Sequence, residues 1–205
     1  EYKAQRPAAP DILISQIIEM HNLFRAFGVA TFEKPGFEAD DLIATFATRF
    51  GGVENLQVVI LTGDRDTLQL VEDEKIVVQT FNKGVSDTTI YDEKAVMEKY
   101  GLPPKAVIDY KALAGDASDN IKGVPGVGPK TATELLRKFG SIENIYKNLE
   151  SDPKLEKRFG PFRKEAELSK ELVTLEKNVP VGDVELFALA LEYDELAITA
   201  YFEKK

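Results

Sequence analysis

Cysteine and tryptophan are both absent from the 205-residue sequence, and His21 is its only histidine. Without cysteine the chain has no disulfide, no thiol nucleophile and no cysteine-based zinc site, and one histidine excludes a zinc site built from several. Long apolar runs are missing too, because the longest, Leu186–Leu191, has only six residues and Val58–Leu61 has four. A membrane span needs far more. We therefore expect no membrane partner, and no signal peptide opens the sequence.

Charged residues are plentiful by contrast, at 30% of the sequence, beside 43% hydrophobic residues. This composition and length are typical of one large globular domain or two small ones. The 26 basic and 35 acidic residues give a net charge of −9, which at first argues against a nucleic-acid partner. The charge is uneven, however, since residues 31–98 sum to −8 and residues 121–140 to +3.

Hydrophobic spacing predicts a change near residue 92, from mixed strands and helices to helices alone. The continuous apolar run Leu56–Leu61 is typical of a buried strand in a parallel sheet. Other β-rich segments are Val29–Phe32, Lys75–Phe81 and Val85–Tyr91. Helices are predicted over Asp11–Phe27, Phe37–Phe50, Glu93–Tyr100, Pro103–Ala114, Lys130–Phe139, Ser141–Asn148 and Phe162–Glu176. We expect an α/β part at residues 1–92 and a helical part at residues 93–205.

Carboxylates gather in three short clusters, each of which also has an ordinary structural explanation. The first opens a predicted helix, where the helix dipole favours acids. The second follows the apolar strand, where α/β sheets bind ligands, but it equally suits a turn whose second acid caps a short helix over Thr67–Val71. The third suits a turn. The seven residues are Glu38, Asp40 and Asp41, then Asp64 and Asp66, then Asp116 and Asp119.

Taken together, the three clusters predict a metal site. Carboxylates brought close together repel one another unless cations neutralise them. Mg²⁺ prefers oxygen ligands, and two such ions about 3.5–4 Å apart are the usual arrangement for phosphodiester hydrolysis. One ion would activate the attacking water and both would stabilise charge. Without these seven acids the net charge would be −2, so the acidity does not exclude nucleic acid.

A segment rich in glycine and proline, Ile121–Ala132, precedes a predicted helix. Its glycines allow a tight turn, and free amides at the helix start beside basic side chains suit a phosphate. This pattern, over about residues 115–140, is typical of a helix-hairpin-helix element, which holds DNA by its backbone. A plain helix–helix turn is the alternative. The candidate DNA contacts are Lys122, Gly126, Gly128, Lys130 and Thr131.

Two cations near the start of the sequence, Lys3 and Arg6, stand one helical turn apart. That spacing suits a phosphate, although solvated surface charge is the simpler interpretation. We interpret His21, in the first predicted helix, as a structural or surface residue.

In this order, the motifs resemble the 5′-nuclease domain of bacterial DNA polymerase I and the related flap endonucleases. The matching segments are Tyr2–Arg6, Phe37–Asp41, Leu61–Asp66, Gly115–Asn120 and Ile121–Ala132. The resemblance covers essentially the whole chain. It implies a PIN-like α/β parallel-sheet core, a helical C-terminal subdomain with the helix-hairpin-helix motif, and metal-dependent cleavage of DNA 5′ ends or flaps in replication and repair.

The resemblance also implies roles for the candidate residues. The seven carboxylates look like ligands, direct or through water, of two Mg²⁺ or Mn²⁺ ions. Lys3 and Arg6 look like the basic residues that steady the scissile phosphate at the base of the family's helical arch. The hairpin Gly126–Thr131 looks like the contact to the downstream DNA duplex, where relatives also bind K⁺. The family further implies a monomer in the bacterial cytoplasm. In some members of the family a polymerase domain belongs to the same polypeptide, and that arrangement stays open for this chain.

Two features of that family have no counterpart in this sequence. The family begins with a strand that carries an Asp-Gly metal motif, and a later strand supplies another metal-binding aspartate before the arch. We therefore expect an N-terminally truncated chain that lacks its N-terminal strands and is catalytically incomplete by itself, in agreement with Glu1 in place of Met. Two other functions remain open, a non-catalytic DNA-binding module and a PIN-type ribonuclease.

Overall fold

The computed structural model describes residues 3–4, 7–149, 151–192 and 194–203. Its strands are β1 (Val58–Leu61), β2 (Ile76–Phe81) and β3 (Thr88–Tyr91). The α-helices are α1 (Asp11–Ala26), α2 (Ala39–Phe50), α3 (Glu93–Tyr100), α4 (Val107–Ala114), α5 (Pro129–Phe139), α6 (Ile142–Leu149), α7 (Pro153–Phe159), α8 (Arg163–Val173) and α9 (Glu195–Glu203). Short 3-10 helices are η1 (Arg65–Leu70), η2 (Pro104–Ala106), η3 (Gly160–Phe162) and η4 (Leu186–Leu189). Within the described ranges, no helix combines the length and apolar character needed to cross a membrane.

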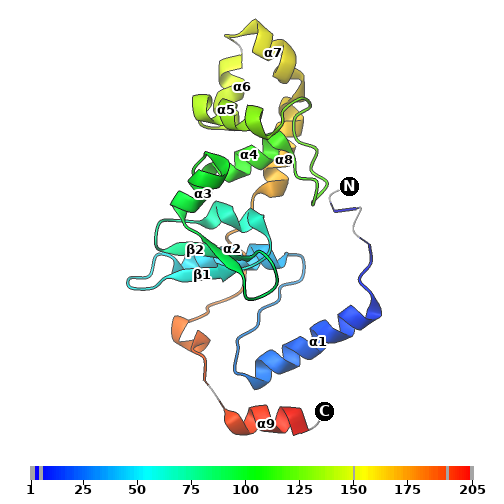
Figure 1. Ribbon diagram of the computed structural model, residues 1–205, viewed down its shortest axis with the longest axis vertical. Coiled ribbons are helices and arrows are strands. Elements are labelled where there is room, and N and C mark those ends of the chain that lie inside the picture. The colour runs from blue at the N-terminus through cyan, green and yellow to red at the C-terminus, as the bar shows by residue number, and fades with distance from the viewer. Residues whose placement is uncertain (1–2, 5–6, 150, 193, 204–205) are drawn as a thin grey trace.

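The sheet has the order β1-β2-β3 (Figure 1). β1 runs parallel to β2, with Val58 opposite Ile76, and β3 returns antiparallel, with Val78 of β2 opposite Tyr91. The predicted parallel core is therefore present in the β1–β2 pair, and β3 adds an antiparallel edge. Within the described part of the chain, no strand pairs with the other side of β1.

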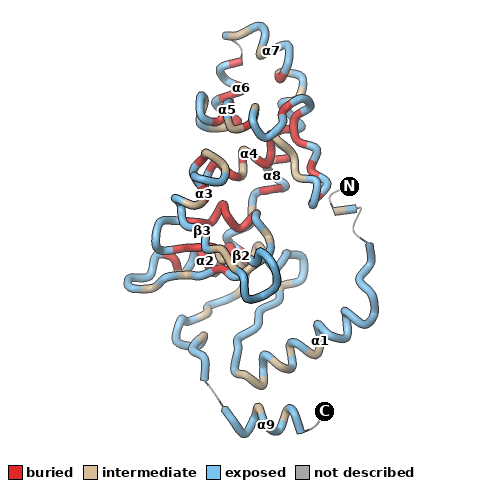
Figure 2. Tube along the Cα trace, viewed as in Figure 1, coloured by how far each residue is buried: buried red, intermediate tan, exposed pale blue. Residues whose placement is uncertain are grey.

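Buried apolar residues form two cores, one above the other (Figure 2). The lower core lies between one face of the sheet and α2, η1 and α3, and includes Ile60, Leu68 and Val78. The upper core fills the helical part between α4, α5, α6 and α8. Helix α4 belongs to both, because Val107 at its start lies in the lower core and Leu113 near its end lies in the upper one. The residues of α4 are thereby held between the two parts of the molecule.

An ion network around the buried Asp109 also holds α4 in place. Lys170 of α8 lies 2.7 Å from a carboxylate oxygen of Asp109 in α4 and 2.7 Å from one of Glu143 in α6. Burial raises the pKa of the Asp109 carboxyl, and the hydrogen bond from Lys170 opposes that rise. Because a buried carboxylate without a partner is costly, this network fixes the orientation of α4 against α6 and α8.

The predicted first helix is confirmed as α1, but its apolar residues are not buried. None of its sixteen residues is buried, and Ile12 is 70% exposed and Ile18 60%. Its packing partner is α9, where the Tyr201 hydroxyl donates a hydrogen bond to Glu19 (Figure 1). The sheet face away from the lower core is open as well, with Val59 and Ile90 about half exposed. Helical periodicity thus identified the helix α1 but did not show which segment packs against its apolar residues.

The strand predicted at Val29–Phe32 is wrong. Gly28 adopts φ +70° after α1, and the backbone N–H of Val29 donates to Phe24 O at 2.8 Å, so this segment completes the end of α1. Phe32 packs on Phe46 of α2, with ring centroids 4.6 Å apart. A four-residue apolar run does not by itself identify a strand, because a strand forms only where a neighbouring strand supplies its hydrogen-bond partners.

Tyr146 of α6 supports a prediction on pH dependence. Its ring lies in the upper core, and its hydroxyl has no hydrogen-bond partner within the described residues. Burial, reinforced by Glu165 and Glu167, raises the pKa of this phenol to about 12. The folded state therefore holds the neutral phenol while the unfolded chain ionises from its ordinary pKa of 10. Stability contributed by this difference is present below pH 10 and is lost as the pH rises towards 12.

We expect Tyr146→Phe to raise the free energy of unfolding by about 1 kcal/mol at pH 7, because it removes a buried unpaired hydroxyl. It should also lessen the loss of stability between pH 10 and 12. Urea unfolding across that pH range measures both effects. Tyr91→Phe is the control, since the Tyr91 hydroxyl accepts a hydrogen bond from Lys99 at 2.9 Å and its removal should stabilise nothing. A Tyr146→Phe variant less stable than wild type at pH 7 would contradict the prediction.

Candidate active site

The three carboxylate clusters come from three separate segments, two of which line one cavity. Glu38, Asp40 and Asp41 begin α2, Asp64 and Asp66 follow the end of β1, and Asp116 and Asp119 follow α4. The second cluster therefore lies where a parallel strand ends, the usual ligand edge of an α/β sheet.

The turn after β1 is built around Asp64. Its backbone N–H donates to Thr62 Oγ1 at 3.0 Å, and one of its carboxylate oxygens accepts from the backbone N–H of Asp66 at 2.9 Å. Asp64 thus caps η1, whereas the turn interpretation expected Asp66 to be the capping residue of a helix over Thr67–Val71. That placement leaves Asp66 inside the 3-10 helix, where it is buried with 7% exposure.

Lys111 is a residue of the site that the sequence analysis missed. It lies on α4, is 9% exposed, contacts the buried Asp66 carboxylate and donates to Asp116 Oδ2 at 2.8 Å. The sequence did carry a signal for this role, because Lys111 lies among apolar residues in the segment Tyr110–Ala114, five residues before Asp116. Lysine is seldom buried without a partner, so its position predicts acids nearby.

Asp116 is held as a carboxylate by its neighbours. Burial acts to raise its pKa, but hydrogen bonds from Lys111 and from Ser118 outweigh that effect and lower the pKa to about 2. The Ser118 backbone N–H and hydroxyl both donate to Asp116 Oδ1, at 2.8 and 2.5 Å. Asp116 is therefore charged over the whole physiological pH range.

The loop that carries Asp116 is locked by a backbone bridge. The N–H of Asp116 donates to Ile121 O and the N–H of Ile121 donates to Asp116 O, each at 2.8 Å. Two glycines close it, Gly115 with φ +81° and Gly123 with φ +64°. A Cβ atom on Gly123 would lie 2.3 Å from the backbone nitrogen of Gly115, so no side chain fits there. The bridge joins the third carboxylate cluster directly to the hairpin.

Asp40 shows that the first and second clusters lie near each other. Burial raises the pKa of its carboxyl, the negative charge of Asp64 raises it further, and Lys3 opposes the rise. Asp41 has another role in this structure, because its two oxygens accept the backbone N–H groups of Glu38 at 3.1 Å and Glu176 at 2.9 Å. The helix cap accounts for Asp41 without any ion.

Lys3 connects the first and third clusters. Its ammonium group pairs with Glu38 and lies 3.9 Å from Asp119 Oδ2, and its backbone N–H donates to Asp119 O at 3.2 Å. The sequence analysis assigned Lys3 to the scissile phosphate, and the structure places it beside two of the candidate carboxylates. Arg6, its predicted companion, lies outside the described residues.

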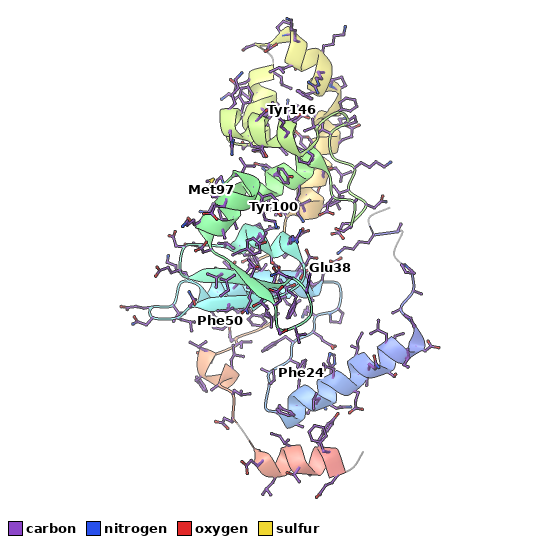
Figure 3. The ribbon with its side chains drawn as sticks, in the orientation of Figure 1. Phe24, Glu38, Phe50, Met97, Tyr100 and Tyr146 are labelled. Carbon is purple, nitrogen blue, oxygen red and sulfur yellow. The ribbon has the colours of Figure 1, made fainter. Side chains whose placement is uncertain are left out.

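A cavity of about 520 Å³ opens between the sheet and the helical part. Its wall carries two of the candidate carboxylates, two cations and two tyrosines: Asp64, Asp116, Arg65, Lys111, Tyr100 and Tyr110. In Figure 3, Tyr100 lies between the helical part and the sheet, and Glu38 lies at the side of the sheet layer nearest the N-terminus. The cavity is thus bordered by charges of both signs and by aromatic rings.

Whether these residues suit a metal ion is a question of donor chemistry. Carboxylate oxygens are the donors that Mg²⁺ and Mn²⁺ prefer, and Asp64 and Asp116 from different segments line one cavity. Across the described residues, no three acids are close enough together to enclose an ion, and Lys3 and Lys111 pair with four of the seven. The donor set fits hard divalent ions, whose positive charge would compete with these two lysines.

The predicted hairpin presents its candidate contacts to solvent. Lys122, Gly126, Gly128 and Lys130 are exposed and Thr131 is half-buried, while Val124 and Val127 between them are buried in the upper core. Gly128 caps α5 with its carbonyl, which accepts from the N–H of Ala132 at 2.9 Å. Arg158 of α7 donates to Gly126 O at 3.1 Å and adds a further cation to this surface.

Two family profiles match the sequence one after the other. Residues 1–101 match the N-terminal resolvase-like domain of the 5′-3′ exonuclease, and residues 102–195 match its C-terminal SAM fold. The chain belongs to the 5′-3′ exonuclease family. The resemblance seen in the motifs is thereby confirmed.

Similar curated proteins include members of this family that are about 40% identical to the chain. A 5′-3′ exonuclease of Aquifex aeolicus is 41% identical over 187 residues, which are 91% of this chain and 61% of the relative. DNA polymerase I of Bacillus caldotenax is 40% identical over 183 residues, which are 88% of this chain and 21% of the polymerase. The chain thus spans about a fifth of that polymerase.

Solved structures of similar fold include two of the bacteriophage T5 enzyme. One, a T5 5′-exonuclease with bound divalent zinc ions, has a TM-score of 0.70 at 23% identity, over 99% of this chain and 76% of that one. Another, a T5 flap endonuclease with DNA and metal ions, has a TM-score of 0.68 at 22% identity, over 100% of this chain and 75% of that one. They confirm the PIN-type α/β core with a helical C-terminal part.

Proposed function

We propose that this chain carries the carboxylate site and the DNA-binding hairpin of a structure-specific 5′-nuclease, which hydrolyses phosphodiester bonds at DNA 5′ ends or flaps. One observation carries the proposal. Asp64 and Asp116, from two distant segments, line one cavity, the charge of Asp64 reaches Asp40 of a third segment, and the loop that supplies Asp116 is bridged to Ile121 at the start of the hairpin segment. The names of the relatives, a 5′-3′ exonuclease and DNA polymerase I, support the same activity.

Two Mg²⁺ or Mn²⁺ ions are the cofactors that we propose. The residues that would hold them, directly or through water, are Glu38, Asp40, Asp41, Asp64, Asp66, Asp116 and Asp119. When bound, such ions supply positive charge beside the phosphorus-bound oxygens and acidify water. Asp41 is the weakest member of this set, because both its oxygens already accept backbone hydrogen bonds.

The chain's own residues bind and orient the substrate. Lys3, beside Glu38 and Asp119, is placed to contact the phosphate that approaches these acids, and we propose the same role for Arg6. Lys111 neutralises Asp66 and Asp116 and so keeps both carboxylates in place while no substrate is bound. Lysine and arginine beside phosphates supply affinity and position without reading sequence.

The hairpin would hold the DNA duplex by its backbone. Its exposed Lys122 and Lys130 and the first turn of α5 offer cations and amides to phosphates. We also propose a K⁺ ion bound by hairpin carbonyls, action as a monomer in the cytoplasm, and a polymerase domain in the same polypeptide.

A cleavage assay with three substrates tests the proposal. The chain, and the product of the complete reading frame that contains it, would be incubated with a 5′-flap DNA, a blunt DNA duplex and a single-stranded RNA, each with MgCl₂ and with EDTA. We expect the complete product to cut the flap DNA only with MgCl₂ and to leave the RNA intact. We expect the chain alone to bind the flap DNA without cutting it.

Each other outcome has a definite meaning. Cleavage of RNA in preference to DNA would support a PIN-type ribonuclease instead. DNA binding without cleavage by the complete product would support a non-catalytic binding module. Efficient flap cleavage by the chain alone would overturn the expectation that it is incomplete.

A further inference from the structure

The cavity beside the acids has an aromatic wall that the hydrolysis itself does not require. Tyr100, the last residue of α3, and Tyr110, in the middle of α4, both line it. Their rings are 5.3 Å apart between centroids and inclined at 69°, an edge-to-face pair. The two rings lie in the same cavity as Asp64 and Asp116, although they come from different helices.

Both tyrosines are fixed by the surrounding structure. They are half-buried and pack against the upper core, and the carbonyl of Tyr100 accepts a hydrogen bond from the Thr133 hydroxyl of α5. Burial raises the pKa of both phenols, so the rings are neutral at physiological pH. Rings held in this way lose little conformational freedom when a flat ligand packs against them.

The charges around the rings suit one kind of ligand. Arg65 and Lys111 stand on the cavity wall with Asp64 and Asp116, so a phosphate has cations close to the acids while a flat base has the tyrosines. The cavity, about 520 Å³, falls within the range of about 300–1,000 Å³ typical of small-molecule sites. A nucleotide matches this combination of anionic and aromatic parts.

We propose that this cavity binds the nucleoside next to the phosphodiester that is cut, with its base against Tyr100 and Tyr110 and its phosphate directed towards Arg65 and the acids. This subsite rests on the proposed nuclease function. Because every base has an aromatic face, stacking of this kind is tolerant of sequence. The subsite would therefore position any terminal nucleotide, which suits an enzyme that recognises DNA structure.

Nucleotide binding by the 205-residue chain tests the inference without any cleavage. The chain would be titrated in magnesium buffer with deoxyadenosine 5′-monophosphate and, separately, with 2-deoxyribose 5-phosphate, which has the phosphate but no base. Stacking on an aromatic side chain strengthens binding by about 5- to 150-fold per base. We expect the nucleotide to bind about tenfold tighter than the sugar phosphate, within that range.

Three variants show whether the rings cause that difference. Tyr110→Leu should bind the two ligands about equally, Tyr110→Phe should keep the roughly tenfold preference, and Tyr201→Leu on α9 is the matched control remote from the cavity. Loss of the preference in Tyr201→Leu, or its survival in Tyr110→Leu, would overturn the inference.

A measurement on the wild-type chain removes any dependence on the folding of the variants. The ring-proton NMR signals of Tyr100 and Tyr110 should shift with the nucleotide, while those of Tyr146 and Tyr201, which do not line the cavity, should not. Shifts at Tyr146 or Tyr201 without shifts at Tyr100 and Tyr110, or no shifts at all, would overturn the subsite. If the complete product cleaves the flap but these shifts are absent, the nuclease function is supported and the subsite is overturned. If the shifts are present but there is no cleavage, the subsite is supported and the nuclease function is overturned.

Discussion

Replacing Asp116 by asparagine in the complete protein is expected to lower the rate of flap cleavage by at least about a hundredfold, because it weakens the binding of an ion that would stabilise transition-state charge, and losing one such stabilising group typically costs that much. Asp116 is charged at all physiological pH values and lines the cavity with Asp64. The substitution removes that charge and keeps the size of the side chain. DNA affinity should change little, because the cations of the hairpin are untouched. Single-turnover cleavage and a gel-shift titration measure the two quantities.

The control for this substitution is Asp183→Asn, which makes the same change of charge at an exposed residue outside the three clusters. It should cleave at the wild-type rate. Equal rates for Asp116→Asn and Asp183→Asn would exclude Asp116 from the catalytic site. A parallel fall in DNA affinity for Asp116→Asn would show that it acts on binding.

Lys111→Met is expected to lower the free energy of unfolding by about 3–5 kcal/mol in metal-free buffer, because it leaves buried carboxylates without their counter-charge. Lys111 is the cation between Asp66 and Asp116, and all three side chains are largely buried. Urea unfolding measures the loss. The exposed Lys105→Met is the control and should change stability by no more than about 0.5 kcal/mol.

The pH dependence of this loss has a definite sign. In the wild type the folded pKa of Asp116 is about 2, below its ordinary value of 3.8. The resulting stability is present above pH 4 and disappears as the pH falls towards 2. The deficit of Lys111→Met should therefore be largest near neutral pH and shrink in acid.

Two further measurements separate this cause from lost packing. Added MgCl₂ should recover part of the lost stability, since a divalent ion bound to the folded state neutralises the same carboxylates. The double variant Lys111→Met/Asp66→Asn should be more stable than Lys111→Met alone. A deficit that neither magnesium nor the second substitution reduces would show that Lys111 acts through packing.

Much of the fold followed from local sequence patterns. The acid-capped helix α2, the apolar strand β1 and the glycine-terminated α3 were all expected close to their observed bounds, because each carries its own start or stop signal. Helices α7 and α9 were not predicted. Apart from its initial proline, α7 has only Leu155 and Phe159 as apolar residues, whereas the apolar residues of α9 lie all around the helix, so neither shows a clear apolar stripe.

The site was predictable in its residue types but not in its contacts. Three carboxylate clusters suggested a metal site, whereas the pairing of Lys111 with Asp66 joins α4 to η1 and depends on the packing of distant segments. The role of Asp41 is a similar case. Its spacing from Glu38 fitted both a helix cap and an ion ligand, and only the structure shows that its second oxygen accepts a hydrogen bond from the backbone N–H of Glu176, far along the chain.

The bridge between Asp116 and Ile121 bears on which changes of chain length this molecule tolerates. With Gly115 and Gly123 in van der Waals contact, one residue inserted between them would shift Asp116 out of register with Ile121 and rotate its carboxylate away from Lys111. The exposed turn between β2 and β3 has no such constraint. Natural insertions and deletions should therefore collect at turns of that kind, while the spacing from carboxylate loop to hairpin stays constant.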